Sequence, residues 1–481
     1  MESTEQNIKS SFKWSTITEV VVKLISPVLN AILARILLPE AFAPLATITM
    51  VISFGEVFVE SGFKKFLIQH DFDSHEEYNR ACNVALWSNV ILSIAIWLII
   101  AVFSKHLAFF LGSPELWQAI ILSGIILPLH SVAGILSGIL QKDLKFQHLF
   151  VVRVITSLIP LIVTIPLALV GLDYWSLIIG NIASVLAQMI ILLFISGYHP
   201  RLYFSIKLFK SMYLYGIWTM LDGIAIWLTS WIDTFIITKY MSDYYLGLYK
   251  NSVSTINALF SIVTAAIIPV LFVGLSKYQN NQEKFSSFFN NTQRRLAMVL
   301  IPLGVGVFLY KDLAVEILFG SSWTEAADII GIVALTSSFR TVFVSICSDA
   351  YRAKAMFKIP LILQVSDICL LIPICILSAQ QGFWHLVYAR ALSKLILIIP
   401  EFIVMKKCLG IDSWNQIRKI IPILIATFLM SCECKLLQLV SDKIVWSLGS
   451  IFIAVLSYLF VLMLFPTSRE DIHLFFKRKR L

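Results

Sequence analysis

Residues 82–103 read CNVALWSNVILSIAIWLIIAVF, a run of 22 residues without Asp, Glu, Lys or Arg. An α-helix rises about 1.5 Å per residue, so this run is long enough to cross the roughly 30 Å hydrocarbon core of a bilayer. A membrane β-strand would need only about ten residues and would alternate apolar with polar side chains. The run therefore predicts a transmembrane α-helix.

The composition of the whole chain agrees with this prediction. Of the 481 residues, 58% are hydrophobic and 14% are charged, whereas soluble domains carry about 25% charged residues. This composition excludes a soluble enzyme, a disordered chain and a secreted disulfide scaffold. The seven cysteines show neither metal-ligand spacing with histidine nor a disulfide framework. We therefore expect an integral membrane protein.

Other stretches of the chain resemble residues 82–103 in length and hydropathy, and together they predict an all-α integral membrane protein with about 14 transmembrane helices. Glycine and proline fall in the breaks or at helix ends. In the fourth span, Gly134 and Gly138 form a GxxxG motif, which indicates close helix packing. The expected spans are 12–37, 41–62, 82–103, 116–140, 148–170, 173–197, 211–238, 248–274, 296–315, 326–350, 359–379, 384–405, 420–438 and 444–465.

Lysine and arginine are distributed unequally between alternate loops. With the N-terminus inside, the inner loops and termini hold 26 of the 38 Lys and Arg residues, and the outer loops hold four. Cytoplasmic loops carry such an excess, so both termini are predicted to be cytoplasmic. The basic run Lys477–Arg480 follows the last span directly, and we interpret it as an anchor at anionic lipid headgroups rather than a nucleic-acid site.

Two hairpins 204 residues apart share a pattern of base, short break, acid and aromatic residue. The first runs from Arg35 to Phe42 and the second from Lys239 to Tyr245. Six predicted spans separate them, so the copies have the same orientation, which is typical of two-lobed alternating-access transporters. The expected parts are an N-terminal six-helix lobe at 1–205, a C-terminal six-helix lobe at 206–410, and an extra helix pair with a basic tail at 411–481.

Several short motifs occur along the chain in a characteristic order. They are Leu33–Leu37 with Pro39–Phe42, Gly62–Phe63 with Leu67–Gln69, Leu140–Phe146, Gly171 with Tyr174–Leu177, Pro200–Ser205, Ile232–Ile237, Leu246–Tyr249, and Leu318–Gly320 with Trp323. In this order they resemble the polysaccharide-transport branch of the MATE-fold (MOP) superfamily, close to the O-antigen and colanic-acid exporters, over roughly residues 10–410. The chain departs from that pattern at Ala43, where a glycine is common, and at Lys64 and Lys65, which replace small residues.

This resemblance implies a flippase of the bacterial cell inner (cytoplasmic) membrane. Members of the family move an undecaprenyl-pyrophosphate-linked oligosaccharide repeat unit from the inner to the outer leaflet by alternating access. The product serves O-antigen, colanic-acid-like or other surface polysaccharide synthesis, and some related members export other wall polymers. The implied partners are membrane lipids, the lipid-linked oligosaccharide, and the polysaccharide polymerase or export machinery. No part of the chain resembles a nucleic-acid module.

Bases within the spans are the candidate substrate contacts, because a pyrophosphate needs a wet cavity lined by cations. A charge at the bilayer centre costs about 2.5 to more than 10 kcal/mol, so charges that persist there usually face the bundle interior. Arg390 and Lys394 share one helix face and repel each other unless an anion or an acid lies between them. Alternatively, Arg35 and Arg153 snorkel to headgroups, and an acid one turn before Lys23 neutralises it. The predicted substrate-binding residues are Lys23, Arg390, Lys394, Arg340, Arg35 and Arg153.

Acids within the spans suggest how transport is driven. Glu56 and Glu60 lie on one face of the second span, where like charges favour the binding of a proton. Asp222 and Asp233 lie on the seventh span, and Asp233 falls on the family's acidic position; the alternative for Asp233 is a structural salt bridge. These four are the predicted ion-coupling residues for an H⁺ or Na⁺ gradient. No other cofactor and no metal site is expected.

Two other functions stand as alternatives. A cation-coupled multidrug exporter of the same fold would line its cavity with acids, whereas this chain carries several bases in its spans. A membrane glycosyltransferase or polymerase of the same pathway would need a long outer loop, but the longest expected ones, 104–115 and 316–325, hold about a dozen residues. The chain also lacks the GxxxxGK[ST], HExxH and GxSxG motifs. We therefore predict that it is not an enzyme.

Overall fold

The computed structural model describes residues 2–59, 62–70, 72–356, 358–441, 443–469 and 471. Every regular element among these residues is helical, which confirms the all-α prediction. The chain divides into two compact units, Met1–Asn251 and Ser252–Leu481, called unit 1 and unit 2. Their boundary lies within one long helix, α10 (Asp243–Lys277).

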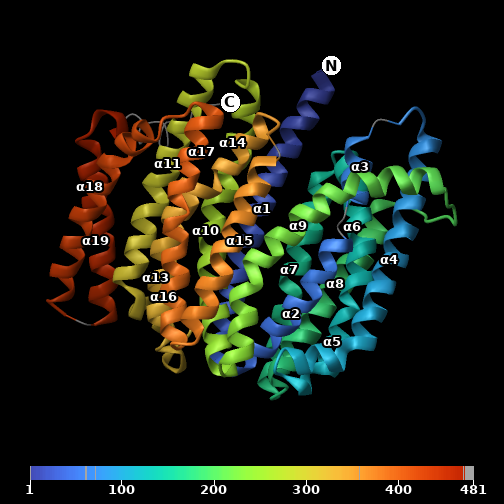
Figure 1. Ribbon diagram of the computed structural model, residues 1–481, viewed down its shortest axis with the longest axis horizontal. Helices are drawn as coiled ribbons and strands as arrows, with labels where there is room; N and C mark the ends of the chain where they lie inside the picture. The colour runs from blue at the N-terminus through green and yellow to red at the C-terminus, as the bar shows by residue number, and fades with distance from the viewer. Residues whose placement is uncertain are drawn as a thin grey trace. The chain divides into compact units, whose positions relative to one another are not determined.

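Unit 1 is built from long helices joined by short loops. Before α10 it contains α1 (Glu2–Ile36), α2 (Pro39–Val59), α3 (Phe63–Gln69), α4 (His75–Phe110), α5 (Trp117–Gly124), α6 (Ile126–Lys142), α7 (Phe146–Leu169), α8 (Asp173–Ser196) and α9 (Ile206–Tyr240). Within it, α7 packs against both α1 and α8, and α6 packs against α4 and α8 (Figure 1).

Unit 2 has α11 near its centre, because α11 packs against both α13 and α18. After α10 it contains α11 (Gln282–Leu309), α12 (Lys311–Leu318), α13 (Ala326–Arg340), α14 (Cys347–Ala353), α15 (Lys358–Ala379), α16 (Phe383–Ile396), α17 (Ile398–Leu409), α18 (Ser413–Gln438) and α19 (Ile444–Met463). In addition, α16 packs against α13 and α15, and α18 packs against α19.

The compact units differ from the predicted parts of the chain. Unit 1 extends past residue 205 to include α9 and the start of α10, and the predicted extra pair, α18 and α19, lies within unit 2. Compactness and repeat symmetry are separate properties, so the two six-helix lobes and the added pair stay a prediction.

Fewer than 14 helices of the described residues meet a simple length and hydropathy standard for crossing a membrane. Eleven helical segments are long and apolar enough to cross a membrane, or up to 12 if the bent pair Asp243–Ala265 and Val270–Lys277 is one span. The two other predicted spans, 12–37 and 384–405, are helical as α1 and as α16 with α17, but they do not meet this standard over the described residues. Charged side chains interrupt their apolar runs, so the count of 14 is not confirmed.

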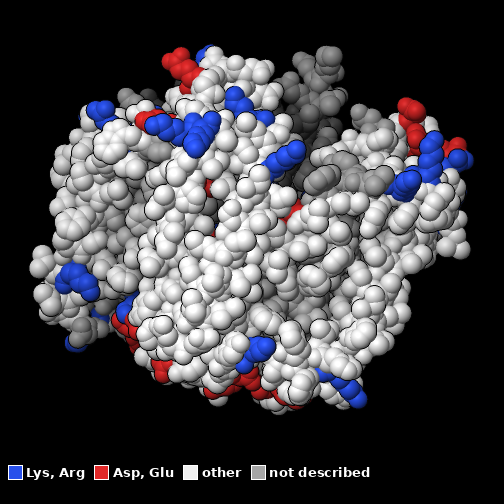
Figure 2. Space-filling model, in the orientation of Figure 1, with Lys and Arg blue, Asp and Glu red and all other residues white. Residues whose placement is uncertain are grey.

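The charged surface agrees with a protein that lies in a bilayer. On the face shown in Figure 2, most Lys, Arg, Asp and Glu side chains gather near the two ends of the helices of each unit, and a broad uncharged band lies between them. Exposed large apolar side chains such as Val102, Phe194 and Ile162 are 73%, 83% and 74% exposed. Such exposure is stable where lipid rather than water surrounds the helices.

One span of unit 2 contains a wide turn. Residues Thr341–Ser345 form a π-helical segment directly after Arg340. Gln293 of α11, which is fully buried, donates a hydrogen bond from Nε2 to the carbonyl of Val342 at 3.0 Å. Because π-helical turns often occur at functional sites, this one favours a functional role for the residues around Arg340.

The segment that follows α19 is fixed to α11. Asp471 is 1% exposed, and its two carboxylate oxygens accept hydrogen bonds from Nε of Arg294 at 2.8 Å and Nε of Arg295 at 2.9 Å. Hydrogen bonds between charged groups are about twice as strong as neutral ones. This contact therefore ties the segment after α19 to α11 at Asp471.

Candidate functional site

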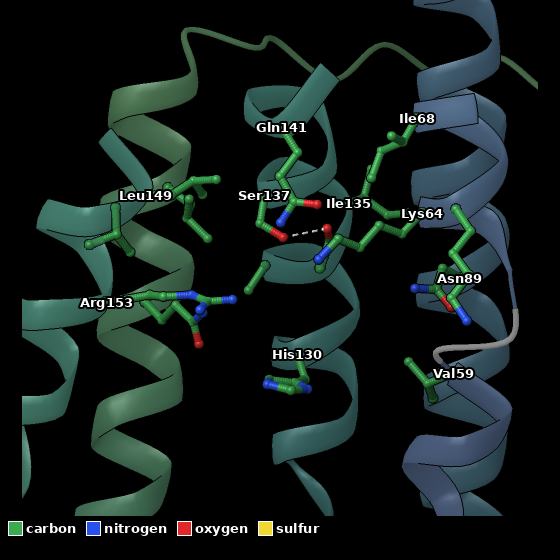
Figure 3. A pocket seen from close by; sticks show the side chains of 16 residues that line it. Val59, Lys64, Ile68, Asn89, His130, Ile135, Ser137, Gln141, Leu149 and Arg153 are labelled. Carbon is green, nitrogen blue, oxygen red and sulfur yellow. Dashed lines mark hydrogen bonds between the residues drawn. The ribbon is translucent and has the colours of Figure 1, made fainter. Parts of the chain in front are cut away.

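A polar cavity of about 440 Å³ lies in unit 1. Its walls come from the end of α2 and from α3, α4, α6, α7 and α8 (Figure 3). The lining residues are Val59, Lys64, Lys65, Ile68, Asn89, His130, Ala133, Gly134, Ile135, Ser137, Gln141, Leu149, Val152, Arg153, Gln188 and Leu192.

The short helix α3 owes its position to a glycine and two buried apolar side chains. Gly62 precedes the helix with φ of 110°, in the left-handed region, and a Cβ at this position would lie 2.4 Å from the Cα of Gly216. Only glycine fits such a backbone at such a distance. Phe63 and Leu67, one turn apart, are 1% and 0% exposed and belong to the core of unit 1. Because that face of α3 is buried, Lys64 and Lys65 on the rest of the helix line the cavity.

The two glycines of the GxxxG motif make room for one of these lysines and for the cavity itself. A Cβ at Gly138 would lie 3.0 Å from Cγ of Lys64, so the lysine side chain runs closely along α6. A Cβ at Gly134 would meet no atom within 4 Å, and Gly134 lines the cavity. Gly138 therefore agrees with the close helix packing that the motif suggested, because α3 lies against α6 there, whereas Gly134 borders the cavity.

The cavity is positively charged. Lys64, Lys65 and Arg153 line it, and no Asp or Glu stands among the described lining residues. His130 also lines the cavity, and its Nδ1 lies 3.8 Å from Oε1 of Glu56. Low-dielectric walls strengthen the field of such cations. Because arginine presents a planar set of donors and lysine a point charge, the arrangement suits a phosphate-like anion.

Uncharged polar side chains complete the lining. Asn89 of α4, Ser137 and Gln141 of α6, and Gln188 of α8 all face the cavity. Carboxamide and hydroxyl groups both donate and accept hydrogen bonds. They therefore add sites for hydroxyl groups beside the sites for an anion.

The structure places the predicted bases of unit 1 differently from one another. Arg153 lines the cavity, whereas Lys23 and Arg35 are not among its described lining residues. Both of these lie on α1, which packs against α7; Lys23 is half-buried and Arg35 is exposed. Arg153 is thus the predicted base that the cavity contains.

The other three predicted bases come together in unit 2. Nη2 of Arg340 donates to Oδ2 of Asp367 at 3.1 Å, and Nζ of Lys394 donates to Oγ of Ser337 at 2.9 Å. Arg390 and Lys394 are 6% and 8% exposed, and Asp367 also attracts Arg390. Asp367 thus lies near Arg340 and Arg390, whereas the hydrogen bond of Lys394 goes to a serine, so an acid or anion between Arg390 and Lys394 stays a prediction.

The predicted coupling acids have different surroundings. Glu56 faces His130 beside the cavity. Asp233 is 5% exposed and accepts hydrogen bonds from the backbone N–H of Thr234 at 2.7 Å and the hydroxyl of Tyr249 at 2.8 Å. Asp222 is half-buried on α9. The fourth predicted acid, Glu60, lies outside the described residues.

Sequence reasoning did not single out most of the cavity. Lys64 and Lys65 drew attention only because they depart from the family pattern after Gly62–Phe63. Asn89 looks like an ordinary member of an uncharged span, and His130 carries no motif. The departure from the pattern at Lys64 and Lys65 and the base Arg153 within a span were thus the signals that pointed toward this site.

A second cavity, of about 500 Å³, lies in unit 2 and is almost entirely apolar. Its walls are parts of α11, α12, α18 and α19. The hydroxyls of its two tyrosines are bonded elsewhere: Tyr310 shares a 2.8 Å hydrogen bond with Ser450, and Tyr458 donates to the carbonyl of Met298 at 2.8 Å. This cavity therefore offers hydrocarbon surface and does not suit an anion.

Comparison with known proteins finds a matching family and relatives in polysaccharide biosynthesis. A family model described as "Polysaccharide biosynthesis protein" matches residues 32–328, more than half of the chain and all of the cavity walls. The chain is 25% identical over 328 residues to the succinoglycan biosynthesis transport protein ExoT of Rhizobium meliloti (strain 1021), covering 68% of the chain and 66% of that protein. It is 23% identical over 418 residues to the lipopolysaccharide biosynthesis protein WzxC of Escherichia coli (strain K12), covering 85% and 82%.

Solved structures show the same fold. The lipid II flippase MurJ in an inward closed conformation matches with a TM-score of 0.79 and 17% identity, covering 95% of this chain and 99% of MurJ. A multidrug resistance MATE family transporter of the MOP superfamily matches with a TM-score of 0.63 and 11% identity, covering 84% and 98%. At these identities the likeness establishes the fold, and it confirms the MATE-like architecture.

Proposed function

The chain belongs to the polysaccharide biosynthesis protein family, and from this premise we propose that it flips a lipid-linked oligosaccharide across the bacterial cytoplasmic membrane. Relatives that carry names of polysaccharide transport and biosynthesis support the substrate class, and the fold shared with a lipid II flippase supports the movement. The many apolar helices belong to a multi-pass membrane protein. The excess of inner-loop bases supports cytoplasmic termini. We propose a diphosphate linkage between lipid and sugar.

The observation that carries this proposal is the basic cavity of unit 1. Lys64, Lys65 and Arg153 supply the positive charge that a diphosphate requires. The two lysines lie in the predicted inner loop that follows the second span, which is the side on which a cytoplasmic substrate arrives. A lipid-linked anion can therefore enter this cavity from the leaflet that holds it.

The same charge argues against a multidrug exporter for organic cations. A cavity that binds cations needs carboxylates, and the described lining of this cavity offers bases and carboxamides. The MATE fold serves transporters with different substrates, so the fold does not decide between them. The charge of the cavity favours the anionic substrate.

The remaining predicted contacts belong to other steps in the proposed cycle. Alternating access exposes different surfaces in turn. We propose that five bases contact the substrate at later stages. Arg340 and Lys394 are hydrogen-bonded within unit 2 in the present conformation. The other three are Arg390, also in unit 2, and Lys23 and Arg35 on α1.

We propose that Glu56 and His130 couple transport to protons. Nδ1 of His130 lies 3.8 Å from Oε1 of Glu56, and His130 lines the basic cavity, so the two side chains are placed to pass a proton beside the substrate site. Asp222, Asp233 and Glu60 stay proposed coupling residues.

A flipping assay in vesicles tests the proposed function. The purified full chain is reconstituted with a fluorescent polyprenyl diphosphate hexose, and the fraction of label that a membrane-impermeant reductant cannot reach is followed over time. The protein should move the label between leaflets faster than protein-free vesicles do. Vesicles that hold heat-denatured protein are the control, and equal rates in all three would contradict the proposal.

Filling the cavity from Gly134 should block this movement. Gly134→Phe places a ring in the cavity, and we expect the flipping rate to fall by about tenfold or more, which corresponds to about 1.4 kcal/mol in the activation free energy of flipping. Gly134→Ala is the matched control, because the added methyl group meets no atom within 4 Å and alanine suits a helix. The vesicle assay measures both. Equal activity of the two variants would contradict the assignment of the cavity.

A further inference from the structure

Asn89 carries a buried hydrogen-bond acceptor that no described group satisfies. The residue is 4% exposed and lines the cavity. Its Nδ2 donates to the carbonyl oxygen of Ser131 on α6 at 3.4 Å, and since a carbonyl can only accept, this bond fixes which end of the amide is which. Its Oδ1 has no hydrogen-bond partner among the residues that the structure describes. Buried polar atoms are nearly always paired, so this oxygen points to a donor on a ligand.

The acceptor shares the cavity with the cations. In Figure 3, Lys64 lies on the same side of the cavity as Asn89, and Arg153 approaches from the other side on α7. A ligand that reaches both walls must carry an anionic group together with a hydrogen-bond donor. Gln141 and Gln188 line the same space and can bond further hydroxyl groups.

The size of the cavity limits what this ligand can be. Ligand sites in proteins commonly enclose about 300–1,000 Å³, and this cavity encloses about 440 Å³. That space suits a phosphate with one sugar ring. A longer oligosaccharide has to extend beyond it.

Building on the proposed function, we infer that the cavity binds the sugar bonded directly to the phosphate, and that Asn89 accepts a hydrogen bond from one hydroxyl group of that sugar. Asn89 is then a specificity-determining residue. A site built to bond a hydroxyl rejects an analogue without it, because the buried acceptor is left unpaired. The phosphate supplies attraction, and Asn89 distinguishes one sugar from another.

Binding of small probes to the purified full chain tests this inference. The probes are inorganic phosphate, inorganic pyrophosphate, and the 1-phosphates of glucose, galactose and N-acetylglucosamine, each titrated while the midpoint of thermal unfolding is followed. At least one sugar 1-phosphate should bind about tenfold more tightly than inorganic phosphate. Asn89→Leu should abolish this advantage and leave the affinity for inorganic phosphate unchanged.

A matched control is Ser88→Ala. Ser88 neighbours Asn89, is 6% exposed and also has an unpaired buried oxygen, but it does not line the cavity. Its replacement should leave the preference for the sugar 1-phosphate unchanged. If Asn89→Leu does not fold, the wild-type chain answers the same question with monodeoxy sugar 1-phosphates, one of which should lose the tenfold advantage.

Separate results would overturn the inference and the proposed function. The inference fails if no sugar 1-phosphate binds more tightly than inorganic phosphate, if every deoxy analogue binds equally well, or if Asn89→Leu weakens phosphate and sugar phosphate alike. In each of these cases the proposed anion site is still supported as long as inorganic pyrophosphate binds to the wild-type chain. Absence of pyrophosphate binding to the wild-type chain would overturn the proposed anion site itself.

Discussion

Replacing Lys64 and Lys65 together by alanine is expected to lower the flipping rate about a hundredfold while the protein still folds and inserts. A hydrogen bond to a charged group contributes about 1.5–3 kcal/mol, and each 1.4 kcal/mol corresponds to about tenfold in binding. Lys64 is half-buried and Lys65 is exposed, so their loss leaves the apolar face of α3, with Phe63 and Leu67, in place. The vesicle assay measures the rate, and size-exclusion chromatography in detergent checks the fold.

The matched control is the double variant Lys207→Ala, Lys210→Ala. These two lysines are exposed near the start of α9, belong to the same predicted inner side, and do not line the cavity. The control removes the same charge from the same predicted side of unit 1. We expect its rate to stay close to that of the wild type. If both double variants slow flipping equally, general surface charge rather than the cavity attracts the substrate.

The membrane fold could be predicted because the bilayer imposes a simple length rule. Uncharged runs such as residues 82–103 follow directly from that rule, and the structure places this run within α4. The rule is less useful at 12–37 and 384–405, where charged residues stand inside helices. A charged residue lowers the mean hydropathy of the surrounding run, so the run is scored as two shorter apolar stretches. The structure shows continuous helix at the first segment and two helices that meet at Leu397 in the second.

The cavity was harder to predict, because its lysines lie where lysines are ordinary. Positive charges in an inner loop are explained by membrane topology alone, so Lys64 and Lys65 stand out only as a departure from the family pattern and not as candidate substrate contacts. Their role becomes visible only when Gly62 turns the chain and α3 lies against α6. Arg153 was predicted because a charged base within an apolar run costs free energy in a bilayer and therefore indicates a function. Asn89 was not predicted because an uncharged amide within a span costs less free energy than a charged side chain, so it is not by itself a sign of a site.

Replacing Asp367 by alanine is expected to destabilise unit 2 by about 3–5 kcal/mol, because removing one partner of a buried ion pair leaves the other without compensation. The Asp367 side chain is 5% exposed and the Arg340 side chain 25%, and they lie 3.1 Å apart. Arg390, itself 6% exposed, would also lose the attraction of this acid. We expect the midpoint of thermal unfolding in detergent to fall by about 10 °C.

The double variant Arg340→Met, Asp367→Ala separates charge from packing. The double variant removes both members of the Arg340–Asp367 pair and leaves only Arg390 without this acid, so it should be more stable than Asp367→Ala alone, despite carrying one more substitution. Asp367→Asn, which keeps the shape of the side chain and removes only the charge, should resemble the alanine variant. Because Arg340 directly precedes the π-helical segment Thr341–Ser345, the same variants also show whether this pair holds the wide turn in place. If the single and double variants unfold at the same temperature, the Arg340–Asp367 contact does not stabilise unit 2.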